Sequence, residues 1–117
     1  MFQRNGVVKI IALNQNKDFR RLYYRGKSSA SANLVTYVMK SRGAGIRVGI
    51  TSSKKIGGAV QRNRARRVIR AAYAELAGRV SGRWDIVFVA RSSTCRVKMQ
   101  AVLADMEKQL VSLGVIR

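Results

Sequence analysis

Residues 47–76 read RVGITSSKKIGGAVQRNRARRVIRAAYAEL, and they join a strand pattern, a basic glycine loop and a long helical pattern. Residues 47–51 are typical of a strand, and 54–58 combine two lysines with two glycines. From 59 to 77 the apolar residues recur at spacings of three and four, which places them on one face of a helix. We expect that face to pack against a core, and its members are Ala65, Ile69, Ala72, Tyr73 and Leu76.

Further elements are predicted on both sides of this unit. A short helix is expected at 17–25, ending at Gly26, and a strand at 34–39, which we expect to form a hairpin with the strand at 47–51. The apolar run 84–90 is typical of a strand buried on both faces. Residues 92–94 are expected to cap a last helix, and residues 114–117 to fray. The apolar stripe of that last helix is predicted at Val97, Ala101 and Ala104, with Met99, Val102, Leu103, Met106 and Leu110 as further candidates.

Strands with helices packed against them predict an α+β fold, a two-layer sandwich with a sheet of about four strands and three helices. The chain has 117 residues, a length that suits one domain spanning 1–117. Within it, we expect residues 1–13 to form a poorly ordered N-terminal segment.

The charge of the chain predicts a polyanionic partner. Lys and Arg number 24 against 5 Asp and Glu, a net charge of +19, yet 47% of the residues are hydrophobic, too many for a disordered basic tail. Self-repulsion opposes the folding of so small a domain, and binding to a nucleic acid relieves it.

The composition also excludes much catalytic chemistry. The chain has no His, one Cys and only five scattered carboxylates, so Ser-His, Cys-His and zinc arrangements are absent. We therefore predict no catalytic residue and no metal ligand, and we interpret Asp18 as an acid at a helix N-terminus. One cysteine, no signal peptide and no spanning run favour a cytoplasmic protein without a membrane partner, and nothing implies a protein oligomer.

The first candidate site is the basic loop and helix. Arg62, Arg66 and Arg70 form one ridge at i, i+4 and i+8, and guanidinium groups pair well with phosphates. A solvated basic face is the alternative, but only Glu75 follows to neutralise the arginines. The predicted nucleic-acid-binding residues, for which the family resemblance described below implies RNA as the ligand, are Lys54, Lys55, Arg62, Asn63, Arg64, Arg66, Arg67 and Arg70.

The second candidate is aromatic. Phe19 and Tyr23 lie four residues apart on the first predicted helix, and Tyr37 lies on a strand that passes beneath them in our prediction. Such rings stack on bases of single-stranded RNA. Periodicity by itself favours ordinary core residues at these three positions.

At this point the sequence resembles a known family. The stretch 47–70, with its Lys-Lys-Ile-Gly loop followed by Ala-Val-Gln-Arg-Asn-Arg and Arg66-Arg67, resembles the protein subunit of bacterial ribonuclease P. The resemblance extends to 16–19 with Tyr23, to 34–37 and to 85–91, and it covers about residues 14–113. Ser52 and Gly58 depart from the family pattern.

The resemblance implies a function and a detail of the fold. It implies a left-handed crossover between strands, an exception to the usual hand. It also implies that the protein binds a catalytic RNA and precursor tRNA, and that the two subunits together remove the 5′ leader. Mg²⁺ and the RNA then carry out the hydrolysis. By the same resemblance, Phe19, Tyr23 and Tyr37 form a cleft that holds the leader, which reverses the interpretation from periodicity.

Two other classes of protein suit the same basic face. A ribosomal or other structural RNA-binding protein would show no dependence on a leader. A DNA-binding module would insert the arginine helix into a major groove and prefer duplex DNA.

Overall fold

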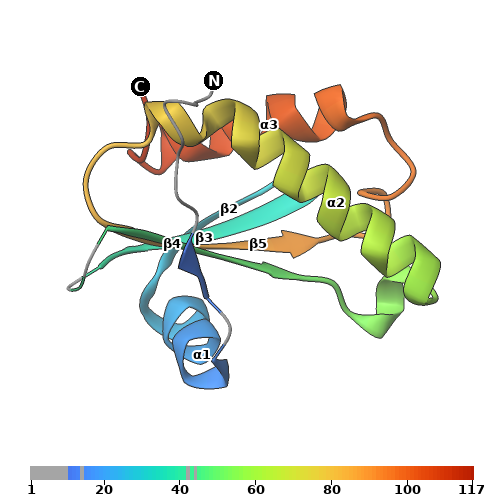
Figure 1. Cartoon of the computed structure of the whole chain (residues 1–117), viewed down its shortest axis with the longest axis horizontal. Coiled ribbons are helices and arrows are strands. Elements are labelled where there is room, and N and C mark those ends of the chain that lie inside the picture. Colours follow the sequence, from blue (N-terminus) through green and yellow to red (C-terminus); the bar gives the residue numbers. More distant parts are fainter. Residues whose placement is uncertain (1–10, 14, 42, 44) are drawn as a thin grey trace.

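The computed structural model describes residues 11–13, 15–41, 43 and 45–117. Eight regular elements and two short 3₁₀ turns follow one another along the chain (Figure 1). They are β1 (Ile11–Ala12), α1 (Asn16–Arg25), β2 (Lys27–Ala30), β3 (Leu34–Lys40), β4 (Ile46–Thr51), η1 (Lys54–Ile56), α2 (Ala59–Leu76), η2 (Ala77–Arg79), β5 (Trp84–Ala90) and α3 (Met99–Ser112).

The strands form one mixed sheet in the order β1-β4-β5-β3-β2. β5 occupies the centre, parallel to β4 and antiparallel to β3, so that Ile86 lies opposite both Val48 and Val38. The predicted hairpin between 34–39 and 47–51 is therefore wrong. The apolar strand β5 separates its two halves, and the turn after β3 spans the start of β5 through hydrogen bonds from Ser41 N to Arg83 O (3.0 Å) and from Trp84 N to Gly45 O (3.2 Å).

Two strands of the sheet were not predicted. β2 runs antiparallel to β3 at the sheet edge, and its sequence Lys-Ser-Ser-Ala carries no apolar alternation. β1 pairs parallel with β4, and Leu13 after it is buried. Residues 11–13 belong to the segment expected to be poorly ordered, whereas residues 1–10 lie outside the described residues.

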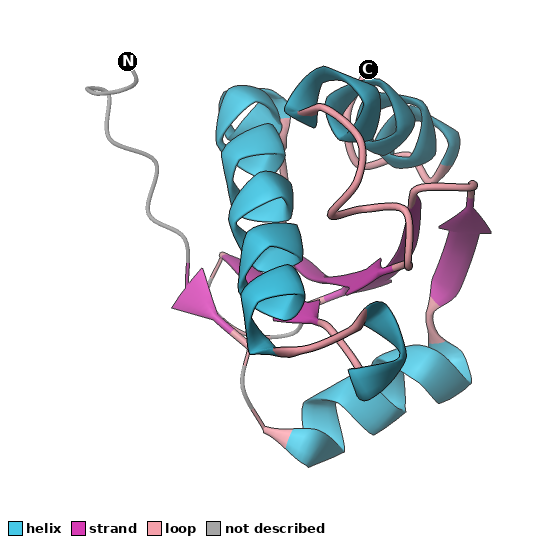
Figure 2. Ribbon diagram, turned by 90° about the vertical axis from the view of Figure 1, so that its right-hand side faces the viewer, coloured by secondary structure: helices cyan, strands magenta, loops and turns pink. Residues whose placement is uncertain are grey.

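Helices cover the two faces of the sheet unequally. α2 and α3 lie on one face and α1 lies on the other (Figures 1 and 2). The sheet with α2 and α3 forms the predicted α+β sandwich. α2 also connects the parallel neighbours β4 and β5, which makes this unit a crossover. The left-handed sense of this crossover stays a prediction.

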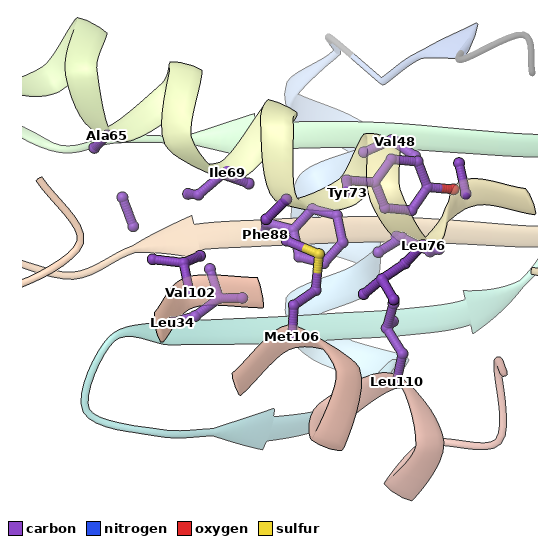
Figure 3. Close-up of a cluster of buried hydrophobic side chains, with 14 of the residues drawn as sticks. Leu34, Val48, Ala65, Ile69, Tyr73, Leu76, Phe88, Val102, Met106 and Leu110 are labelled. Atoms are coloured by element: carbon purple, nitrogen blue, oxygen red, sulfur yellow. The ribbon is translucent and has the colours of Figure 1, made fainter. Parts of the chain in front are cut away.

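The main core lies between the sheet and the pair α2 and α3. Phe88 of β5 packs beside Met106 and Tyr73, and the Tyr73 and Phe88 ring centroids are 5.5 Å apart (Figure 3). The predicted face of the long helix is confirmed, because all five of its members are buried. Burial of so much apolar surface is the main force that holds the helix on the sheet.

The C-terminal region differs from its prediction. α3 begins at Met99, and Ser93 and Thr94 instead donate hydrogen bonds to Ala32 O (2.7 Å) and Asn33 O (2.6 Å) in the turn between β2 and β3. Val102, Met106 and Leu110 form the buried stripe, whereas Ala104 is exposed, so the stripe through Ala104 is wrong.

The expected fraying at 114–117 is also wrong. Val115 and Ile116 are 1% and 5% exposed, and Val115 N donates to Leu110 O over 2.9 Å. Gly114, at φ 80°, allows the chain to turn back onto the core.

Candidate nucleic-acid interface

The arginines of α2 do not all serve one surface. Arg66 and Arg70 are exposed and border a hollow of about 340 Å³ between α2 and the side of the sheet formed by β1 and β4, where Val48, Ile50 and Tyr73 form part of its lining. Arg62 lies on the same ridge and is half-buried. The predicted ridge at i, i+4 and i+8 thus runs along the flank of α2 that faces β4.

Arg64 lies on the opposite flank. Its Nε donates a hydrogen bond to the carbonyl oxygen of Cys95 over 2.8 Å, so this arginine attaches α2 to the loop before α3. Asn63 and Arg67 are exposed between the two flanks. Spacing alone did not distinguish Arg64 from its neighbours, because the loop that it contacts is distant in sequence.

The start of α2 is arranged as an anion site would be. Lys54 and Lys55 are exposed in η1, and the helix N-cap is Gly58, which has no side chain to accept the first N–H groups. Gly57 has a φ of 140°, which favours glycine. Free N–H groups at the positive end of a helix dipole attract phosphate.

The three predicted aromatic residues meet on the other face of the sheet. The Tyr23 and Tyr37 ring centroids are 4.9 Å apart, with the rings inclined at 70°. Phe19 is partly buried over Gly49, and Tyr23 is 43% exposed. We call Phe19, Tyr23 and Tyr37 the aromatic strip. Phe19 and Tyr37 pack against a small apolar cluster around Leu22 and Val87, whereas Tyr23 keeps exposed ring surface.

The sheet continues beyond the aromatic strip without a helix over it. Val35, Thr51 and Val89 are neighbours in register on β3, β4 and β5, and all three are only partly buried. They lie on the α1 face, because Thr36 and Phe88 point into the main core on the other side. α1 covers only part of this face, and η1 lies at its far end, after β4 (Figure 1). The uncovered face therefore lies between the aromatic strip and the lysines of η1.

Ion pairs fix α1 on this face. Asp85 is 1% exposed and accepts hydrogen bonds from Arg47 Nε (2.9 Å) and from Arg21 (3.0 Å), while Asp18 accepts one from Arg21 (3.3 Å). The hydrogen bond to Asp85 raises the pKa of Arg47 despite the opposing effect of burial. Sequence reasoning missed this cluster, and Asp18 is a buried acid of α1 that pairs with Arg21 and Arg47, besides lying near the N-terminus of the helix. The signal available in the sequence was Asp85, the one charged residue in the otherwise apolar run 84–90.

The described residues offer no metal centre and no membrane-spanning helix. Nowhere among them do three His, Cys, Asp or Glu side chains gather as ligands would. Cys95 is buried. No helix in the described part of the chain has the length and apolar character needed to cross a membrane.

Comparison with known proteins identifies the family. The profile of the family described as Ribonuclease P matches residues 9–114. The chain belongs to the ribonuclease P protein family. The ribonuclease P protein component of Clostridioides difficile is 40% identical over 102 residues, which cover 86% of each chain, and that of Listeria monocytogenes is 35% identical over 91 residues, which cover 77% of this chain and 76% of the relative.

Solved ribonuclease P proteins share the fold. The protein from Staphylococcus aureus superposes with a TM-score of 0.81 at 29% identity and covers 93% of this chain and 100% of its own. The protein from Thermotoga maritima gives 0.74 at 26% identity and covers 91% and 97%. The chain is thus the protein subunit of an endoribonuclease that acts in tRNA 5′ processing with an RNA subunit.

Proposed function

We propose that this ribonuclease P protein binds its catalytic RNA through α2 and the 5′ leader of precursor tRNA through the aromatic strip. The RNA-contacting set is the one predicted from sequence, and we call it the basic surface: Lys54, Lys55, Arg62, Asn63, Arg64, Arg66, Arg67 and Arg70. Arg66 and Arg70, both exposed and both directed to the β4 flank, supply the phosphate contacts, whereas Arg64 acts partly through the loop at Cys95.

The contact of Tyr23 with Tyr37 is the observation that carries the leader assignment. A tyrosine that is 43% exposed at the border of an uncovered sheet face offers ring surface on which an unpaired base can stack. Lys54 and Lys55 at the far end of that face attract the leader phosphates. A leader bound there positions the scissile bond for the RNA subunit.

The chemistry belongs to the RNA subunit in this proposal. Mg²⁺ bound in the ribonucleoprotein would supply the activated water for hydrolysis of the phosphodiester. Among the described residues of this chain, no three His, Cys, Asp or Glu side chains gather at one place. The protein acts by neutralising phosphates and by holding substrate, and the expectation of a cytoplasmic location stays a prediction.

Binding of Tyr23→Ala to two RNAs tests the leader assignment. In the reconstituted ribonucleoprotein, we expect a weaker affinity for precursor tRNA and an unchanged affinity for mature tRNA, because only the precursor carries the leader. Val111→Ala, which shortens an exposed side chain on α3, serves as the control. An equal loss for both RNAs would contradict the assignment.

A further inference from the structure

The outer face of α1 carries an aromatic ring that the fold does not use. Tyr24 is 91% exposed, and Lys17 and Arg20 lie at i−7 and i−4 on the same side of the helix. This side of the helix is an open, nearly flat surface. The residues that form it, which we call the α1 outer patch, are Lys17, Arg20, Arg21, Tyr24 and Arg25.

Packing does not account for the patch. α1 rests on the sheet through Leu22 and Phe19, and its one acid, Asp18, is buried beneath it. Asp18 therefore faces away from Lys17 and Arg20, and in the described part of the chain the ion pairs of α1 are those of Asp18 and Arg21. Cations and an aromatic ring left in solvent on one helix face indicate a binding surface.

The chemistry of the patch fits an unpaired nucleotide. A tyrosine ring stacks on any base, and neighbouring Arg and Lys side chains pair with the flanking phosphates. A membrane surface fits poorly, because the apolar side of α1 is already buried on the sheet and Tyr24 is the one large apolar side chain of the patch.

The position of the patch indicates which RNA it meets. At 100° per residue, Arg20 lies between Tyr23 and Tyr24 around the helix, so exposed surface continues from the aromatic strip to the outer patch. The patch lies on the face of the sheet opposite α2 (Figure 1), away from the arginines of that helix. An RNA strand that leaves the aromatic strip therefore reaches Tyr24 by passing over the exposed side of α1.

We propose that the leader continues upstream from the aromatic strip over α1, where one of its bases stacks on Tyr24 and its phosphates meet Arg20 and Lys17. This inference rests on the proposed function, since it extends the same leader site. It makes the affinity for precursor tRNA depend on leader length beyond the nucleotides that the strip holds.

A leader-length series on the reconstituted ribonucleoprotein tests the proposal. A series of substrates has the same tRNA body and unpaired leaders that differ in length by single nucleotides. The shortest leader for which Tyr23→Ala lowers the affinity of the ribonucleoprotein defines the substrate that contacts only the aromatic strip. We expect Tyr24→Ala to leave that substrate unchanged and to weaken the longest leader by roughly fivefold or more. We expect Tyr24→Phe to keep the affinity, and Arg20→Ala to lower it for the longest leader only. Lys108→Ala, which removes an exposed charge from α3, is the matched control.

The outcomes separate the two proposals. If Tyr24→Ala binds every leader like the unaltered protein while Tyr23→Ala weakens binding of precursor tRNA and leaves binding of mature tRNA unchanged, the outer patch is not a leader site and the proposed function stands. If Tyr24→Ala lowers the affinity equally for short and long leaders, the proposal of a leader site at the outer patch is also overturned. If Tyr23→Ala lowers the affinity for precursor and mature tRNA equally, or for neither, the leader site itself is wrong and the patch proposal falls with it.

Discussion

Arg47 and Asp85 are register partners on the neighbouring parallel strands β4 and β5, and their side chains form a two-pronged ion pair. Arg47 donates from Nε (2.9 Å) and from a terminal nitrogen (2.8 Å) to the two carboxylate oxygens of Asp85. Arg21 of α1 adds a third hydrogen bond to the same carboxylate. The pair therefore attaches the helix that carries Phe19 and Tyr23 to the centre of the sheet.

Asp85→Asn tests this attachment. The amide keeps the volume of the side chain but cannot neutralise two guanidinium groups, so we expect the free energy of unfolding to fall by about 3 kcal/mol. Urea denaturation measures the change. Arg79→Ala, which removes the exposed ion pair with Glu107, is the control and costs less than about 1 kcal/mol. Equal losses of unfolding free energy in the two variants would show that the buried ion pair stabilises the fold no more than the exposed one does.

Gly49→Ala tests the seat of the aromatic strip. A Cβ at this position would lie 2.6 Å from Phe19 Cε1 and 3.0 Å from the Leu13 carbonyl oxygen, so the Phe19 ring has to move. We expect an unfolding free energy lower by about 1–3 kcal/mol, measured by urea denaturation, and weaker binding of precursor tRNA. Gly78→Ala, whose Cβ would meet open space, is the matched control. Unchanged stability and binding in Gly49→Ala would mean that Phe19 is not held against β4.

Salt dependence tests the phosphate contacts of the basic surface. If about five phosphates are neutralised, the logarithm of the affinity for the catalytic RNA falls with the logarithm of salt concentration at a slope of roughly −3.5 to −4.5. Replacing both Arg66 and Arg70 by Ala removes two exposed cations, and the slope should become shallower by roughly 1.4–1.8. Filter binding over a salt series measures both slopes. A slope near zero for the unaltered protein would remove the electrostatic basis of the proposal.

Alkaline unfolding tests the burial of Tyr73. Burial raises the pKa of Tyr73 to about 12 from an ordinary value of 10.0. The unfolded chain loses this proton at lower pH than the folded chain, so this contribution to stability is complete below pH 10 and falls as the pH rises toward 12. Comparison of unfolding free energies across this range should show a smaller fall for Tyr73→Phe. Tyr24→Phe, at an exposed position, should keep the full fall, and the same curve for all three proteins would contradict the account.

Local patterns predicted the helices and the strongest strands. The spacing from Ala65 to Leu76 identified the buried face of α2, and the apolar run 84–90 identified the central strand β5. The pairing of strands was not predictable in the same way, because β5 enters between β3 and β4 from far along the chain. β2 was missed since Lys27 to Ala30 form an exposed edge that needs no apolar alternation.

The candidate site was likewise predictable only in part. Sequence spacing grouped the α2 arginines, but the different role of Arg64 depends on the Cys95 carbonyl of a distant loop. Periodicity favoured a core role for Tyr23 and Tyr37, and the family resemblance pointed to a site. The structure shows why both interpretations had grounds, since the two rings pack edge to face while Tyr23 keeps exposed surface. No periodic pattern in the sequence singled out Tyr24 as a site residue, because the property that distinguishes it is the solvent exposure of its side chain.

The most direct test of the central claim is cleavage of 5′-labelled precursor tRNA at low Mg²⁺ by the protein, by its RNA subunit, and by the two together. The claim is that this chain assists an RNA catalyst and contributes no reacting group. It predicts cleavage at the mature 5′ end only in the mixture. Cleavage by the protein alone would contradict the noncatalytic role, and failure of the protein to stimulate the RNA would contradict its role as the partner subunit.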